Sequence, residues 1–378
     1  MTSYVQINSF CDSWAKDIIF GKHNRLLESG VDSYVFWGHG EHEQDSHMQC
    51  IQSTFGRYVD ALQTRIDGRV GFHSKRSTQS FLELLDTIEP DTVHLHSLIG
   101  YYINIEMLFN WLASRDCRVV WTLHDCWAFT GHCLHFTYVG CEQWRTCCEA
   151  QYICPQTKVY VKTYKVGGVK KSFEEKRRLF TMLPRERLSL ITPSEWLKGL
   201  VEDSFLSKYD VVVERNEIDH SIFRPITSDF RSKYNIGNRR IILCVASRWT
   251  NRKGLDDVIR LAGDLDSREA VVVVIGLNHK QLRQLQTTII ALPKMNSAKE
   301  LAEAYTAADV LFNPTKEDNY PTVNLESEAC GTPVVTYDTG GSRETISLQE
   351  SIAIQDYNAA KMYIFSLLGI GGIERTKF

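Results

Sequence analysis

The sequence predicts an α/β protein with two doubly wound domains, each a parallel sheet between layers of helices. Short apolar runs without polar alternation recur along the chain, and amphipathic segments of helical period separate them. Such runs are typical of strands that are buried on both faces and joined by right-handed crossovers. The pattern restarts after residue 223, so we expect domains at 1–222 and 223–378, facing each other across a cleft.

In the first domain, strands are expected where the apolar runs are rich in β-branched and aromatic residues. They lie at 4–8, 33–38, 92–97, 118–125, 188–194 and 210–214. Amphipathic segments at 78–88 and 194–205 have the spacing of helices that cover a sheet. The segment 216–225 ends in a proline, and we expect it to be the linker.

The second domain repeats this organisation. Strands are expected at 240–247, 270–276, 288–292, 309–315 and 333–338, and helices at 253–265, 280–286, 297–308 and 324–330. Ligands of doubly wound sheets bind at the carboxyl ends of the strands, where helix N-termini point inward. Residues that directly follow a strand are therefore the first candidates for a site.

Composition narrows the class of protein. The 378 residues are 43% hydrophobic and 24% charged, with a net charge of −3, so nothing calls for nucleic acid as a partner. The first twenty residues lack the basic start and apolar core of a secretory signal, and no apolar run approaches the roughly 20 residues of a membrane span. We expect a cytoplasmic protein, whose eleven cysteines are mostly reduced thiols.

The first candidate site follows the strand at 309–315. Asp318 lies in the loop, Pro321 fits the first turn of the next helix, and Glu326 lies on the early turns of that helix. The N–H groups of Thr322 and Val323 are donors at a helix start, which suits a phosphate. A carboxylate one turn later can accept two ribose hydroxyls. The alternative is that Asp318 only caps the helix and Glu326 is solvated.

Two cations follow the strand at 240–247. Arg248 and Lys253 lie between this strand and the next expected helix, where the helix dipole slightly disfavours positive charge. Their spacing allows both to reach the α- and β-phosphates of a nucleoside diphosphate. The alternative is a pair of solvated cations.

The stretch EDNYPTVNLESEACGTPVVTYDTGG, residues 317–341, resembles the signature of the family 4 retaining glycosyltransferases, which have the GT-B architecture of two Rossmann-like domains. The resemblance implies that Asp318 and Glu326 are the two acids of the family's E-x7-E motif, and that Arg248 and Lys253 form its R-x4-K motif. The segments 119–133 and 191–198 resemble capsule and exopolysaccharide transferases. By that resemblance His124 faces the donor sugar, Asp125 lies beside it, and catalysis requires no metal.

A group of cysteines falls in an expected insertion at 131–157, after His124. Four thiolates within reach of one another suit tetrahedral zinc, but the irregular spacing fits plain thiols as well. The expected zinc ligands are Cys133, Cys141, Cys148 and Cys154. Elsewhere, we expect His94 and His96 to point to opposite faces of their strand, which argues against a shared metal.

These features lead us to expect a retaining transferase that moves a sugar from a UDP- or GDP-sugar to a saccharide or a lipid-linked acceptor in surface polysaccharide synthesis. Eight cations between Lys158 and Arg178 are either a solvated face or a contact to a lipid-linked acceptor or to an anionic membrane, at its cytoplasmic face. Three departures from the family weaken the acceptor side: residues 8–17 contain no glycine, Glu217 replaces one, and the C-terminal region is short. The alternatives are therefore a non-catalytic partner that binds a sugar nucleotide, or an epimerase of the same architecture.

Overall fold

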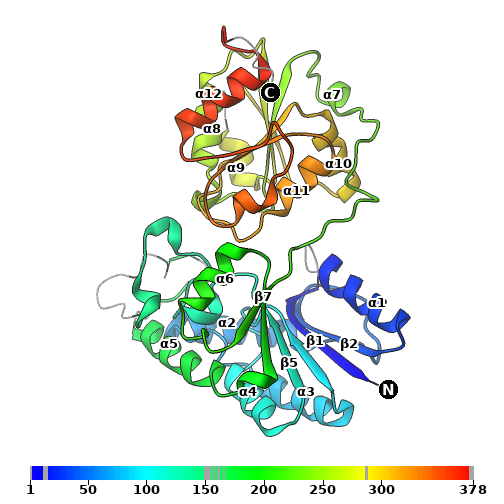
Figure 1. Cartoon of the computed structure of the whole chain (residues 1–378), viewed down its shortest axis with the longest axis vertical. Helices are drawn as coiled ribbons and strands as arrows, with labels where there is room; N and C mark the ends of the chain where they lie inside the picture. Colours follow the sequence, from blue (N-terminus) through cyan, green and yellow to red (C-terminus); the bar gives the residue numbers. More distant parts are fainter. Residues whose placement is uncertain are drawn as a thin grey trace. The chain divides into compact units, whose positions relative to one another are not determined.

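The computed structural model describes residues 2–11, 16–148, 154, 156, 158–159, 162–164, 167–285 and 288–373. The chain divides into two compact units, Met1–Arg215 and Asn216–Phe378. Ile218, Ile222 and Phe223 pack into the core of the second unit, so residues 216–222 group with that unit. Figure 1 shows both units, and each is described by itself below.

The first unit is built on a seven-stranded parallel sheet. Its strand order is β3-β2-β1-β4-β5-β6-β7, and the register pairs Val5 with Tyr34 and with Val93. The strands are β1 Ser3–Phe10, β2 Asp32–His39, β3 Met48–Cys50, β4 Thr92–Leu95, β5 Arg118–Thr122, β6 Leu188–Thr192 and β7 Asp210–Val213. The six expected strands are confirmed, whereas the short edge strand β3 was not predicted.

Helices cover this sheet. They are α1 Gly21–Glu28, α2 Thr54–Asp67, α3 Lys75–Ile88, α4 Ile105–Ser114, α5 Gly167–Phe180 and α6 Glu195–Glu202. Hydroxyl and amide side chains fix where three of them begin: those of Ser53, Asn104 and Ser194 accept a hydrogen bond from a backbone N–H of the first turn. Helices α3, α4 and α5 pack side by side.

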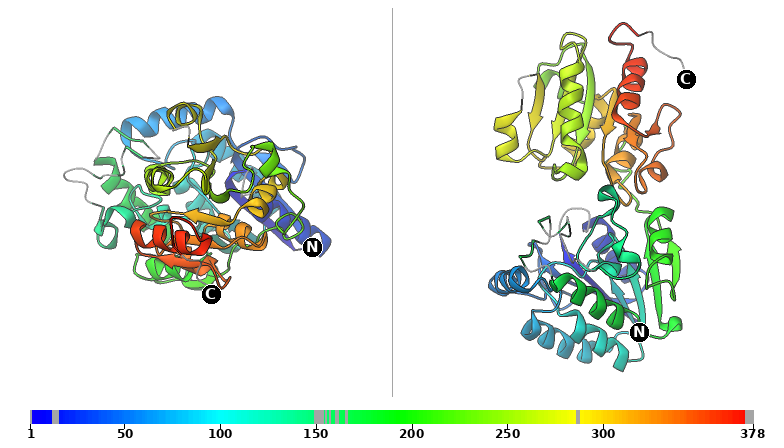
Figure 2. Two further views of the ribbon diagram at one scale, coloured as in Figure 1. Left: turned by 90° about the horizontal axis from the view of Figure 1, so that it is seen from above. Right: turned by 90° about the vertical axis from the view of Figure 1, so that its left-hand side faces the viewer.

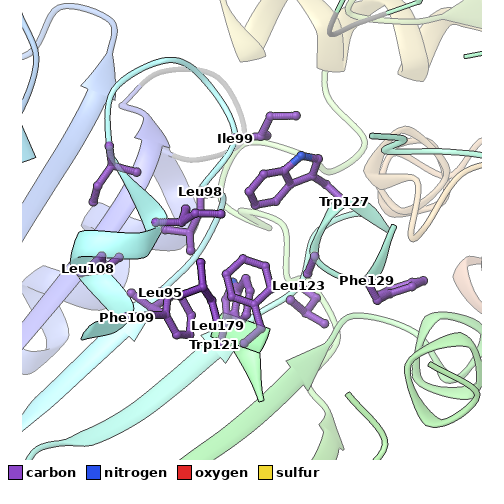
Figure 3. Packing of buried hydrophobic residues seen from close by; sticks show 14 of the residues in the cluster. Leu95, Leu98, Ile99, Leu108, Phe109, Trp121, Leu123, Trp127, Phe129 and Leu179 are labelled. Carbon is purple, nitrogen blue, oxygen red and sulfur yellow. The ribbon is translucent and has the colours of Figure 1, made fainter. Parts of the chain in front are cut away.

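Alternate residues of the strands enter different cores, as expected of a sheet buried on both faces. Phe36 belongs to the main core of the unit, while its neighbours Val35 and Trp37 pack on the other face against Ile19 and Phe20. Figure 3 shows part of the main core, where Trp121 of β5, Phe109 of α4 and Leu179 of α5 are buried together with other large apolar residues.

The second unit is a six-stranded parallel sheet of order β10-β9-β8-β11-β12-β13. Its strands are β8 Arg240–Val245, β9 Ala270–Ile275, β10 Ile289–Leu292, β11 Val310–Asn313, β12 Val334–Tyr337 and β13 Ile352–Ile354. The helices are α7 Phe230–Lys233, α8 Leu255–Asp264, α9 His279–Gln284, α10 Ala298–Ala307, α11 Thr322–Ala329 and α12 Tyr357–Leu368. Figure 2 gives two further views of these elements.

The two faces of this second sheet also bury separate cores. Ile242 and Cys244 of β8 pack in one core, which receives α8 and α12, and Ile241 and Leu243 pack in the other, which receives α10. The strand order reverses between β8 and β11 here, and between β1 and β4 in the first unit. These are the switch points at which doubly wound sheets bind ligands.

The described part of the chain contains no helix that is both long enough and apolar enough to cross a bilayer.

Candidate active site

The loop between β8 and α8 carries the two predicted phosphate-binding cations. Arg248 is exposed and makes no ion pair with a described residue. Lys253 ends the 3₁₀ turn η6, Asn251–Lys253, and its side chain is only 18% exposed. Burial lowers the pKa of Lys253, although the carboxylate of Asp318 raises it in part. The two cations therefore lie in one loop, but only Lys253 is largely shielded from solvent and paired with an acid.

Asp318 is the partner of Lys253. Its Oδ2 accepts a hydrogen bond from the Lys253 ammonium, and Nη1 of Arg252 lies 3.8 Å from the same oxygen. The other carboxylate oxygen accepts the backbone N–H of Asn319 at 3.0 Å. The structure thus joins the loops after β8 and β11 through a buried carboxylate and two cations.

Two glycines allow these loops to approach each other. Gly254 has a φ of +74°, and a Cβ there would clash with the carbonyl oxygen of Pro314. Gly340 has a φ of +60°, and a Cβ there would clash with the carbonyl oxygen of Asp318. The neighbouring N–H of Gly341 donates to that oxygen at 3.0 Å. Glycine is required at both positions, and the loop after β12 holds Asp318 through its backbone.

The start of α11 has a proline at its N-cap position. Pro321 has a φ of −67°, its own side chain makes no capping hydrogen bond, and no acid lies in the first turn. We predicted Pro321 within the first turn, whereas α11 begins one residue later, at Thr322. The carboxylate of Asp318 bonds Lys253 and Asn319, two contacts that the capping alternative does not include. Thr322 and Val323 are half-buried at the helix start, where their N–H groups lie at the positive end of the helix dipole.

Glu326 lies one turn into α11. Its Oε2 accepts the hydroxyl of the buried Tyr305 at 2.8 Å. Burial and the neighbouring carboxylate raise the pKa of Tyr305 well above its usual value, so this phenol stays a donor. Glu326 therefore contacts a buried residue of its own unit, whereas the alternative expected it to be only solvated.

A buried amide network fixes α11 against the sheet. The amide group of Asn313, at the end of β11, donates to Oδ1 of Asn324 at 2.9 Å, and Asn324 donates to the hydroxyl of Thr345 at 2.8 Å. Asn324 is fully buried. Satisfied polar networks in a core specify one arrangement of the parts they join, so the helix start is held in a defined place.

In the first unit, three histidines form a chain at the switch point. The rings of His94 and His96 have centroids 4.0 Å apart, and Nδ1 of His96 lies 3.3 Å from Nε2 of His124. The hydroxyls of Tyr4 and Thr122 each lie 2.8 Å from a ring nitrogen of His94. The prediction of opposite faces was wrong, because residues two apart on a strand share a face.

His124 and Asp125 directly follow β5. Burial lowers the pKa of His124 to about 4, so its imidazole is neutral at neutral pH. Asp125 accepts the backbone N–H of Trp127 at 2.8 Å, and burial raises the pKa of its carboxyl group. The structure places His124 at a strand end as expected and shows that Asp125 also holds the turn that follows.

The four predicted zinc ligands form one cluster around Cys133, which forms a thiol hydrogen bond with Cys154. That bond and burial raise the pKa of Cys133, while burial raises the pKa of Cys148 to about 12. The N–H of Gly131 donates to the sulfur of Cys148 at 3.2 Å. Nevertheless, within the described ranges no three histidine, cysteine or acidic side chains are placed to hold a metal ion. The four cysteines therefore lie in one cluster, and zinc binding by them stays a prediction.

The basic run at 158–178 is only partly described. Within α5, Lys176 is buried: it donates to the carbonyl of Trp127 at 2.6 Å and lies over that indole ring. Burial lowers its pKa to about 7. Arg178 pairs with Glu106 and Glu175. These two cations therefore serve the structure of the unit.

Sequence reasoning missed several polar residues beside the predicted ones. Arg252 and Tyr305 contact the two acids, Asp318 and Glu326. Three further residues each bury a polar side-chain atom that has no hydrogen-bond partner in the described part of the chain: Ser9, His96 and Ser342. Ser9 lies near the end of β1 and His96 follows β4, the two strands of the first switch point, whereas Ser342 begins the 3₁₀ turn η7, Ser342–Thr345, after β12. Only His96, two residues beyond the strand histidine His94, had a signal in the sequence.

A chain with two Rossmann-like units, each built on a parallel sheet, has the GT-B fold. Sucrose-phosphate synthase from Thermosynechococcus elongatus superposes with a TM-score of 0.67 at 14% identity, over 100% of this chain and 92% of its own. HepE from Anabaena, solved with UDP-glucose, gives a TM-score of 0.61 at 10% identity, over 97% and 90%.

Sequence comparison gives the class of enzyme. Residues 227–364 match the family described as glycosyl transferases group 1. A protein of Escherichia coli K12, whose name assigns it to colanic acid biosynthesis as the glycosyl transferase WcaC, is 24% identical over 352 residues, which are 88% of this chain and 82% of the relative. The second unit therefore contains a segment that matches the group 1 glycosyltransferases, and the similarity to the E. coli relative extends over most of the chain.

Proposed function

We propose that the chain is a retaining glycosyltransferase of family 4, which transfers a sugar from a UDP- or GDP-sugar to a saccharide or lipid-linked acceptor in surface polysaccharide synthesis. The observation that carries this proposal is the ion pair of Lys253 and Asp318, both less than one-fifth exposed, in the loops after β8 and β11. The biosynthetic context is supported by the name of the colanic acid relative, and the donor class by the UDP-glucose bound to HepE.

The leaving diphosphate is stabilised by Arg248, Lys253 and the N–H groups of Thr322 and Val323. Negative charge grows on the diphosphate as the glycosidic bond breaks, so fixed donors aimed at it favour the transition state. Lys253 already has one carboxylate partner, and a diphosphate gives it a second anion. Asp318 then shares its cation and accepts hydroxyls of the donor sugar.

The two remaining roles concern orientation. Glu326 accepts the ribose hydroxyls, with Tyr305 holding its carboxylate in place. His124 faces the donor sugar as a neutral imidazole that can donate or accept a hydrogen bond, and Asp125 supports the turn beside it. We name no nucleophile, and the proposed reaction requires no metal in this site.

A donor panel tests the proposal. The full chain is incubated with UDP- and GDP-sugars without an acceptor, and the products are separated by chromatography. A transferase slowly hydrolyses one donor and releases the nucleoside diphosphate, an epimerase isomerises the sugar, and a binding protein does neither but is stabilised by the ligand in a thermal shift. Either of the last two results would contradict the proposal.

A further inference from the structure

Helix α2 exposes its apolar side chains and buries polar ones. Its buried residues are Asp60 and Thr64. Phe55, Leu62 and Ile66, in contrast, are 78%, 60% and 62% exposed. The apolar face of a surface helix normally packs on the core of its own domain. A reversed helix therefore needs another explanation for its apolar residues.

The exposed residues form one continuous face, which we call the α2 stripe: Phe55, Tyr58, Val59, Leu62 and Ile66. Spacings of three and four residues place them on the same side of the helix, along about 17 Å at 1.5 Å per residue. Tyr164, which is 84% exposed, lies beside the last turn of α2, because its N–H donates to the carbonyl of Arg65 at 3.0 Å. The stripe is thus an extended apolar surface.

Hydrogen bonds on the buried side fix the rotation of α2. Asp60 accepts hydrogen bonds from the hydroxyl of Thr64, at 3.2 Å, and from that of Ser74, which begins α3. The amide group of Gln52 donates to the same Ser74 hydroxyl at 3.0 Å. Turning the apolar residues inward would break this buried network, so the outward stripe is built into the fold.

The charge around the α2 stripe is positive. Residues 54–79 contain five lysines and arginines but two aspartates, in a chain whose net charge is −3. Asp60 is buried, and Asp67 accepts the N–H of Arg69 at 2.9 Å and contacts His73 at 3.2 Å. Within residues 54–79 the exposed charges beside the stripe are therefore cations: Arg65, Lys75 and Arg76. One exposed acid, Glu41, lines a cavity with Thr54 and Arg57 at the start of α2. Lys75 and Arg76 also line a cavity of about 730 Å³ between α2 and α3, together with Phe55.

We propose that the α2 stripe docks the chain on an anionic lipid surface, with its apolar side chains among the acyl chains and Arg65, Lys75 and Arg76 at the headgroups. Apolar residues flanked by cations are the combination that binds such surfaces in the plane of the interface. A second copy of this chain fits less well, because a two-fold contact would bring the same cations against each other. The inference goes beyond the proposed transfer reaction and does not depend on it.

Vesicle sedimentation tests the proposal with the full chain. The wild type should pellet with vesicles of phosphatidylcholine and phosphatidylglycerol, and much less with phosphatidylcholine alone or in 0.5 M salt. The double variant L62D/I66D should bind more than tenfold more weakly, since two exposed apolar anchors become anions. Lys75→Glu with Arg76→Glu should weaken binding to the anionic vesicles only.

Matched substitutions elsewhere serve as controls. Met362→Asp, on an exposed position of α12, and Lys299→Glu, on α10, should pellet as the wild type does. Circular dichroism and melting temperatures establish that each variant is folded. The proposal is overturned if the wild type stays in solution with anionic vesicles, or if L62D/I66D pellets equally well. It is also overturned if the wild type sediments as a dimer and L62D/I66D as a monomer, because a second copy then covers the stripe.

Discussion

Replacing either partner of the Lys253–Asp318 pair should separate its structural role from its role in donor binding. Both side chains are less than one-fifth exposed. Removing one partner of a buried pair costs about 3–5 kcal/mol. In Lys253→Met, Arg252 remains 3.8 Å from the same carboxylate oxygen and compensates part of the charge, so we expect a loss of about 2 kcal/mol. That corresponds to a melting temperature roughly 4–8 °C lower.

The two variants should differ in nucleotide binding. Lys253→Met loses a charge-assisted hydrogen bond to a phosphate, of about 1.5–3 kcal/mol, so UDP or GDP should bind roughly 10- to 150-fold more weakly. Asp318→Asn keeps Lys253 and removes its competing anion, so the diphosphate should bind as well as in the wild type or more tightly. Turnover should nevertheless fall, because the amide cannot replace the carboxylate toward the sugar hydroxyls.

Isothermal titration and thermal melts on both variants measure these effects. The matched control is Arg231→Met, which breaks a 2.7 Å ion pair to Asp309 and leaves Arg240 at 2.8 Å from the same acid. It should lower the melting temperature without changing nucleotide affinity. Unchanged affinity in Lys253→Met, or equally weak binding in Asp318→Asn, would refute the assigned roles and leave a structural ion pair.

Three further predictions concern other parts of the chain. Gly340→Ala should destabilise the second unit by more than about 1 kcal/mol, because the new Cβ would clash with the carbonyl oxygen of Asp318. The control Gly263→Ala places its Cβ in open space within α8 and should not destabilise the unit. Urea unfolding of both variants compares the two free energies. The pKa of His124 is about 4 in the folded chain and 6.5 in the unfolded chain, so the neutral imidazole contributes its full stabilisation above pH 6.5. The free energy of unfolding should therefore fall as the pH drops from 6.5 toward 4, by at most roughly 3 kcal/mol. A free energy of unfolding that stays constant from pH 7 to 4.5 contradicts this. If the four clustered cysteines hold zinc, elemental analysis of freshly purified, reduced protein should find about one equivalent, and finding none would end that hypothesis.

The sequence predicted the fold well because its signal is local. Buried parallel strands need continuous apolar runs, and the runs at 240–247 and 270–276 contain β8 and β9. Strand β3, Met48–Cys50, was not predicted, because three residues at the edge of a sheet are too few to form a recognisable apolar run. Helix α2 has a clear helical period, yet its apolar residues face outward, which periodicity alone cannot reveal.

The candidate site was predictable only in part. The positions of Asp318 and Glu326 after β11 follow from the order of strand, loop and helix. Their partners come from distant parts of the chain: Lys253 reaches Asp318 from the loop after β8, and Tyr305 reaches Glu326 from α10. Such contacts depend on which strands are neighbours in the sheet, and a single sequence does not contain that information.

The most direct test of the account is the affinity of Glu326→Gln for nucleoside diphosphates. The substitution keeps the size of the side chain and its contact with Tyr305, so the melting temperature should stay that of the wild type. If Glu326 accepts ribose hydroxyls, loss of its charge should weaken binding of UDP or GDP about tenfold or more, since hydrogen bonds to charged groups contribute about 1.5–3 kcal/mol each. Equal affinity of the variant and the wild type, measured by isothermal titration, would contradict a nucleotide-sugar site at α11.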